Sequence, residues 1–216
     1  MNLAEKITPS KRVVCETCHF VQKHCLCSAI TPQRCNTNII ILQHPLEHKH
    51  AKNSAKLVNL SINNCQLVIG ETCEDFADIQ EKLQKRTQNQ LTQGQTQKLT
   101  YLIYPSEQAQ NIEQFETCQS KCANSKDITL IFIDASWRKA YKMWQLNPWL
   151  QALPTLTFAN APKTRYQIRK HKKETSLSTL EAVAYCLEQL ENADTSALHN
   201  AFDAMIAIHN RYRPNN

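Results

Sequence analysis

The stretch from Asp134 to Trp137 holds the side chains best suited to chemistry. It places a carboxylate (Asp134), a hydroxyl (Ser136) and an indole (Trp137) directly after the apolar run 128–133. Such a run is typical of a buried strand, and open α/β sheets bind their ligands beyond the carboxyl ends of their strands. A carboxylate at this position can accept a proton, and an indole can stack on a planar ring. We therefore predict a site in which Asp134, Ser136 and Trp137 are the catalytic residues.

The same residues also allow structural interpretations. Asp134 could serve as the N-cap of the helix that follows it. Trp137 could pack in the core, because Tyr141 and Trp144 continue the same stripe at helical spacing. These alternatives stay open at the level of the sequence.

Polar groups also follow two other predicted strands. His44 and Glu47 come after the apolar run 38–42, and Tyr104 and Pro105 close the run 99–104. Strand ends that meet at one edge of a sheet form a crevice, which is where a cofactor binds. We therefore predict that these four residues bind a cofactor, although a single loop histidine is more often a structural, hydrogen-bonded residue.

Four cysteines crowd into a short N-terminal segment: Cys15, Cys18, Cys25 and Cys27. A C-x-x-C pair followed by a C-x-C pair fits one tetrahedral zinc ion better than disulfides, which are rare in a reducing compartment. The alternatives are four free thiols, or a site in which His19, His24 or Cys35 replaces one thiol. We predict a structural zinc site in a small ribbon, residues 1–35, ahead of a main domain, residues 36–216.

A basic run with one aromatic residue spans 163–173. Cations beside a stacking ring suit an RNA backbone with an exposed base, although a solvated loop would have the same composition. The helix that follows begins with Ser178 and Glu181 at the spacing of a capping box. The predicted RNA-binding residues are Lys163, Arg165, Arg169, Lys170, Lys172 and Lys173.

Strand and helix patterns alternate along the rest of the chain. The expected strands are 38–42, 65–69, 99–104, 128–133 and 154–158, and the expected helices are 54–60, 76–90, a segment from 137, 177–191 and 197–212. The Gln- and Thr-rich stretch 84–98 predicts an exposed loop. Alternating strands and helices indicate an α/β fold, with a mostly parallel sheet covered by helices on both faces.

The composition limits the possible functions. With 216 residues and 42% hydrophobic content the chain can form one sizeable core, and its net charge is +6. Two glycines, Gly70 and Gly94, cannot build a G-x-G-x-x-G turn or a P-loop. No stretch approaches the roughly 18 apolar residues of a membrane span, and no signal peptide is evident, so we expect a cytoplasmic protein with no membrane partner.

These motifs, in this order, resemble those of the DTW domain family, in which Asp-x-Thr-Trp follows a core strand. The resemblance runs from Cys15 to about Leu187 and includes the cysteine cluster and a Leu-Ser-Thr-x-Glu-Ala segment from Leu177. Ser136 stands where the family usually has threonine and keeps the hydroxyl. Gln167 stands where arginine is common, so an ionic contact there would fall to Arg165 or Arg169.

The resemblance implies a fold related to the SPOUT class, with a C-terminal trefoil knot. It also implies a tRNA-uridine aminocarboxypropyltransferase, which transfers the 3-amino-3-carboxypropyl group of S-adenosylmethionine to N3 of a uridine in tRNA. Asp134 would be the base, Trp137 would stack on a base or adenine, and Arg169 and Lys170 would hold phosphates or the cofactor carboxylate. Further cofactor-binding residues implied by the family are Tyr166, Ser178 and Thr179. The alternatives are an RNA methyltransferase of the same broad fold and a zinc-containing RNA-binding protein without activity.

Overall fold

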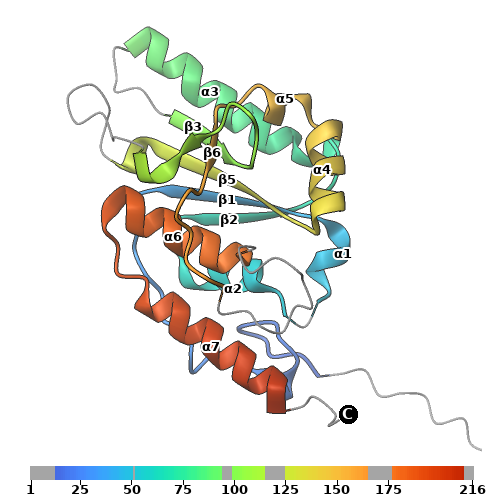
Figure 1. Ribbon diagram of the computed structural model, residues 1–216. Coiled ribbons are helices and arrows are strands. Elements are labelled where there is room, and N and C mark those ends of the chain that lie inside the picture. Colours follow the sequence, from blue (N-terminus) through green and yellow to red (C-terminus); the bar gives the residue numbers. More distant parts are fainter. Residues whose placement is uncertain (1–12, 51, 94–98, 115–124, 165–176, 212–216) are drawn as a thin grey trace, which may run out of the picture.

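The computed structural model describes residues 13–50, 52–93, 99–114, 125–164 and 177–211 (Figure 1). Its centre is a six-stranded sheet in the order β2-β1-β5-β3-β6-β4. Every neighbouring pair in this sheet is parallel, which confirms the predicted α/β class. The strands are β1 (Asn38–Gln43), β2 (Cys65–Ile69), β3 (Leu99–Ile103), β4 (Gln110–Asn111), β5 (Ile128–Asp134) and β6 (Thr155–Thr157).

The sheet buries both of its faces, as the unbroken apolar runs predict. Along β1, Ile39 and Ile41 belong to one hydrophobic cluster, whereas Ile40 and Leu42 belong to another. Successive side chains of a strand point to opposite faces, so each run supplies both clusters.

Helices cover each face (Figure 1). The first face carries α3 (Ala77–Gln93), α4 (Trp137–Leu146) and α5 (Pro148–Gln151); the second carries α2 (Ser54–Ser61) and α6 (Thr179–Glu191), with α7 (Ser196–Arg211) packed outside them. The short helix α1 (Pro45–His48) lies at the carboxyl edge of the sheet. Four 3-10 turns complete the described elements: η1 (Gln22–His24), η2 (Glu74–Phe76), η3 (Ile112–Gln114) and η4 (Ser125–Asp127).

The loop predicted for 84–98 is wrong for residues 84–93, because α3 continues to Gln93. Glutamine, lysine, arginine and leucine favour helices even where they lack apolar periodicity. Residues 94–98 lie outside the described part of the chain.

The cysteine segment packs on the second face of the molecule. Cys15, Cys18, Phe20 and Leu26 are buried in the same hydrophobic cluster as the inner sides of α2, α6 and α7. The division of the chain near residue 35 therefore stays a prediction, since the two parts share buried contacts. None of the helices that the structure describes is both long and apolar enough to cross a bilayer.

Candidate functional site

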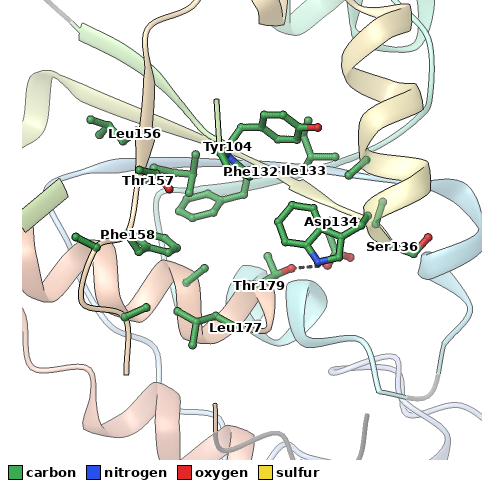
Figure 2. Close-up of a pocket in the computed structure, with 18 residues that line it drawn as sticks. Tyr104, Phe132, Ile133, Asp134, Ser136, Leu156, Thr157, Phe158, Leu177 and Thr179 are labelled. Atoms are coloured by element: carbon green, nitrogen blue, oxygen red, sulfur yellow. Dashed lines mark hydrogen bonds between the residues drawn. The ribbon is translucent and has the colours of Figure 1, made fainter. Parts of the chain in front are cut away.

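A cavity of about 360 Å³ lies beyond the carboxyl ends of β3, β5 and β6, between the first turns of α4 and α6 (Figure 2). Its walls are mostly apolar and include Ile103, Phe132, Leu156 and Phe158. Asp134 is the one carboxylate among the described residues that line it. The cavity lies where the strand-end motifs predicted a site.

Strand geometry directs Asp134 toward the second face of the sheet. Asp134 follows Phe132 by two residues, and Phe132 belongs to the cluster beneath α6. In the parallel pairing of β1 and β5, Asp134 lies beside Gln43, the last residue of β1. The carboxylate therefore projects from the sheet edge toward the start of α6.

Two donors from different elements hold the Asp134 carboxylate. The Gln43 side-chain amide donates to Oδ2 over 2.7 Å. The Thr179 hydroxyl, in the first turn of α6, donates to Oδ1 (dashed line in Figure 2). A carboxylate offers about four acceptor positions, so lone pairs remain for a further donor. The alternative role as helix cap is wrong, because the N-cap of α4 is Ser136, whose side chain makes no capping hydrogen bond.

Gln43 is part of a buried amide pair that the sequence did not reveal. Its side chain is fully buried and donates to Asn53 Oδ1 over 2.9 Å, and Asn53 Nδ2 donates back to Gln43 Oε1 over 3.3 Å. Asn53 also caps α2 by accepting from the Lys56 N–H. The only sequence signal was an amide at the end of an apolar run. The pair anchors the Asp134 carboxylate to the start of α2.

Trp137 lines the cavity and is 61% exposed, so the core-packing alternative is wrong. Tyr141 is exposed as well. Trp144 stacks on Tyr104, with ring centroids 5.7 Å apart and an interplanar angle of 9°. Tyr104 lines the cavity, and burial together with the neighbouring Tyr141 raises its pKa. Trp137 and Tyr141 are therefore exposed, with Trp137 at the site, whereas Trp144 is half-buried and packs against the hydrophobic cluster of the first face.

Glu113 fixes the loop that forms the far wall of the cavity. Its carboxylate accepts from the backbone N–H of Ala159 over 2.9 Å, from that of Asn160 over 2.8 Å, and from the Tyr185 hydroxyl over 2.8 Å. Burial would raise the pKa of Glu113, but these donors outweigh it and the pKa is lowered. Burial and the Glu113 carboxylate raise the pKa of Tyr185 to about 12. The Tyr185 ring meets Phe158 edge to face, which holds this wall in place.

Neither His44 nor Glu47 lines the cavity. His44 is buried; its Nδ1 accepts from the Leu46 N–H over 3.1 Å, and its Nε2 lies 3.6 Å from Glu71. Glu47 forms an ion pair of 3.0 Å with Lys139 of α4. Their predicted contact with a cofactor stays a prediction.

The remaining predicted residues have mixed positions. Pro105 and Thr179 line the cavity. Ser178 is the N-cap of α6 and forms the predicted capping box with Glu181, which is confirmed. Lys163 is exposed and does not line the cavity. The other predicted residues of this region lie outside the described part of the chain: Arg165, Tyr166, Arg169, Lys170, Lys172 and Lys173.

The four cysteines form a cluster that fits a metal ion. Their sulfur atoms all lie within 4.8 Å of one another, and three pairs are 3.6, 3.6 and 3.8 Å apart. A tetrahedral zinc ion with bonds of about 2.3 Å separates its sulfur ligands by about 3.8 Å. The backbone N–H groups of Cys18 and Thr17 lower the pKa of Cys15 to about 6, whereas hydrogen bonds with the Cys25 and Cys15 thiols raise the pKa of Cys27 to about 12. Cys15, Cys18, Cys25 and Cys27 therefore suit a closed four-thiolate site.

Comparison with known proteins finds relatives that include three proteins of the same name. The chain is 28% identical over 191 residues to the tRNA-uridine aminocarboxypropyltransferase 2 of Drosophila melanogaster, and the match covers 85% of this chain and 69% of that protein. Proteins of the same name from Mus musculus and Macaca fascicularis are 26% and 27% identical. Those matches cover 84% and 86% of this chain. They cover 57% and 59% of the two mammalian proteins, so the chain spans less than two thirds of the length of either.

No solved structure matches the chain. The family model described as the DTW domain matches residues 12–210, a range that includes the cysteine cluster, the cavity and the capping box of α6. The chain therefore belongs to the DTW domain family.

Proposed function

We propose that the protein transfers the 3-amino-3-carboxypropyl group of S-adenosylmethionine to N3 of a uridine in tRNA. The observation that carries this proposal is the Asp134 carboxylate, which lies in an otherwise apolar cavity and is held by Gln43 and Thr179. The names of the relatives support the substrate and the group transferred.

The cavity suits S-adenosylmethionine by size and by charge. About 360 Å³ lies within the range of roughly 300–1,000 Å³ that is typical of small-molecule sites. The aromatic side chains of Tyr104, Phe132 and Phe158 form walls that suit adenine. The described lining residues include one carboxylate and no lysine or arginine, and this balance of charge favours a cationic sulfonium. When bound, the cosubstrate would supply the alkyl group on a sulfonium that leaves as neutral methylthioadenosine.

Asp134 acts as the base in this proposal. Its carboxylate takes the proton from uridine N3, and the nitrogen electron pair forms the new N–C bond while the C–S bond breaks toward sulfur. Gln43 and Thr179 each occupy one lone pair of the carboxylate and fix its direction, so little reorganisation is needed when the proton moves. The apolar walls limit the access of water that would compete with uridine N3 for hydrogen bonds to the carboxylate.

Trp137 is placed to hold the uracil ring. Its indole lines the cavity and is largely exposed, as a platform for a flipped-out base requires. Ser136, with its side chain free of any capping bond, orients a neighbouring polar group. Both roles are part of the proposal.

Finer features of the family complete the proposal. A relation to the SPOUT class, with a C-terminal knot, is part of this proposal. Residues 165–176, which join Thr164 to Leu177, lie outside the described part of the chain. RNA contacts in the basic segment 163–173, and cofactor contacts by Tyr166, Ser178, His44 and Glu47, come from the same expectation. The four-thiolate zinc site would be structural, because its closed ligand set leaves no position for a substrate.

The test is product analysis with purified protein, S-adenosylmethionine and an unmodified tRNA transcript. We expect methylthioadenosine and a uridine carrying the 3-amino-3-carboxypropyl group. Asp134→Asn should lower the rate by at least about 100-fold, since a positioned base contributes roughly 10²–10⁴. Asp127→Asn, at the opposite end of β5, is the matched control and should keep the wild-type rate.

Two outcomes would contradict the proposal. Release of S-adenosylhomocysteine with a methylated nucleoside would identify a methyltransferase. An unchanged rate in Asp134→Asn would remove the carboxylate from the mechanism.

A further inference from the structure

The outer side of α4 carries aromatic and cationic side chains in two adjacent rows. Trp137 and Tyr141 form one row and are 61% and 56% exposed. Arg138 and Lys142 form the other, and both are exposed. Residues four apart lie on the same side of a helix, and consecutive residues are about 100° apart, so the rows lie side by side. These four residues are called the α4 face below.

The α4 face is positively charged. Helix α4 contains three cations and no carboxylate. The neighbouring carboxylates are already engaged: Glu47 pairs with Lys139 over 3.0 Å and Glu71 pairs with Lys142 over 2.8 Å. The Glu47 and Glu71 side chains are 15% and 27% exposed, whereas that of Lys142 is 63% exposed. Arg138 and Lys142 therefore face solvent, whereas Lys139, whose side chain is 30% exposed, lies with Glu47 at the base of the helix.

Exposed apolar side chains also gather at this part of the molecule. Seven large hydrophobic residues are exposed in the described part of the chain, and five of them belong to α4, to α1 or to the last position of β2: Leu46, Ile69, Trp137, Tyr141 and Leu146. Concentrated exposure of this kind marks an interaction surface. Helix α1 adds the exposed cation Lys49 at its end, and the Glu47–Lys139 ion pair joins α1 to α4.

We propose that the α4 face binds the single-stranded RNA segment that contains the target uridine. Unpaired bases stack on Trp137 and Tyr141, and phosphates contact Arg138 and Lys142. Aromatic platforms beside cations are the usual means of binding single strands, because every base has a π-face and every nucleotide a phosphate.

The inference rests on the proposed function, because the RNA must deliver a uridine to the cavity. Trp137 belongs both to the cavity and to the α4 face, so a strand held along this face continues directly into the site. Duplex RNA keeps its bases stacked and paired, so the α4 face selects an unpaired loop.

The test measures binding of unfractionated tRNA to the full chain by fluorescence anisotropy over a salt series. Arg138→Glu should weaken binding roughly tenfold and lower the salt slope by about one, since one phosphate contact is lost. Tyr141→Ser should weaken it roughly tenfold, and Tyr141→Phe should bind like the wild type because the ring is retained. Arg86→Glu, an exposed cation on α3, is the control with unchanged affinity.

The outcomes separate this inference from the proposed function. If the wild type forms the modified uridine while Arg138→Glu and Tyr141→Ser keep wild-type affinity for tRNA and the same KM, the α4 face is not the RNA site. If both variants lose affinity but no aminocarboxypropyl product ever forms, the surface is correct and the reaction is wrong. Equal loss of affinity in Arg86→Glu, or tighter binding of a perfect RNA duplex than of tRNA, would also overturn the inference.

Discussion

Thr179 shapes the site through a single hydroxyl that donates to the Asp134 carboxylate. Thr179→Val keeps the shape of the side chain but removes the donor. A hydrogen bond to a charged group contributes roughly 1.5–3 kcal/mol, so kcat should fall roughly 10–100-fold, with a smaller change in the KM for tRNA. Steady-state kinetics with a tRNA transcript measure both.

Thr179→Ser is the matched control, because it restores the hydroxyl and should recover most of kcat. If the valine and serine variants lose activity equally, the methyl group rather than the hydroxyl matters, and the positioning of Asp134 by this hydrogen bond is refuted.

Gln43 should be sensitive to substitution although it never touches the cavity. Gln43→Leu removes a fully buried amide and leaves the Asn53 side chain without one of its partners. An unsatisfied buried polar group costs about 1–3 kcal/mol, so the free energy of unfolding should fall by that amount in urea denaturation. Gln84→Leu, on the exposed side of α3, should change it by less than about 0.5 kcal/mol. Equal stability of Gln43→Leu and the wild type would count against the buried amide pair.

At the scale of single residues, the sequence located Asp134 at the end of a buried strand but did not reveal the partners of its carboxylate. The position of Asp134 at the edge of the sheet was predictable, because it directly follows a buried strand, but its sequence context also allowed a role as a helix N-cap. Gln43 was not predictable, because its contact depends on the register of β1 against β5, which no local pattern fixes. The sequence did not decide whether Trp137 packs in the core or lines the site, because an aromatic stripe on a helix has the same spacing in both cases.

At the scale of elements, Glu113 joins η3, the loop after β6 and α6. Its pKa lies below the ordinary value of 4.5, so its ionised form stabilises the fold above that pH. This stabilisation is lost as the pH falls through the lowered pKa of the folded state. The free energy of unfolding should therefore decrease from about pH 5 to about pH 3, and Glu113→Gln should flatten that decrease.

The measurement for Glu113 is urea denaturation at a series of pH values for both proteins. Asp78→Asn, at an exposed position of α3, serves as the control and should follow the wild-type curve. A Glu113→Gln variant with the same acid slope as the wild type would show that other carboxylates carry the dependence.

Elements with strong patterns were predicted well, and weakly patterned ones were not. The strands at 38–42, 65–69 and 128–133 were found within one residue, because β-branched runs leave little choice. Strand β4 was missed because it is two residues long and exists only by pairing with β6. The end of α3 was misplaced because its polar second half depends on helix propensity rather than on periodicity.

At the scale of the whole molecule, the cysteine cluster should matter for stability rather than for chemistry. Cys15 and Cys18 are buried in the same cluster as α6 and α7, so loss of a metal ion would loosen that face. The purified protein should contain about one zinc ion per chain by elemental analysis. Cys18→Ser or a strong chelator should remove it and lower the melting temperature by roughly 5 °C or more.

Cys73→Ser is the control for the cluster, since the Cys73 thiol only donates to the Leu146 carbonyl and a hydroxyl can do the same. It should retain the zinc and the wild-type melting temperature. A metal-free protein with an unchanged melting temperature would show that the thiols pack without an ion.

The general architecture could be predicted from the sequence, but the packing between distant parts of the chain could not. Alternating strand and helix patterns specify a parallel sheet between two helical layers. They do not reveal that the N-terminal cysteine segment shares a hydrophobic cluster with the C-terminal helices, because that packing depends on contacts between distant parts of the chain.

The hydrogen bond between Thr179 and Asp134 joins residues 45 positions apart. During synthesis, the sheet edge that carries the carboxylate leaves the ribosome well before α6 does. A nascent chain that ends before Thr179 therefore has the acid without its second donor and without one wall of the cavity. The site is therefore complete only when α6 has docked against the edge of the sheet.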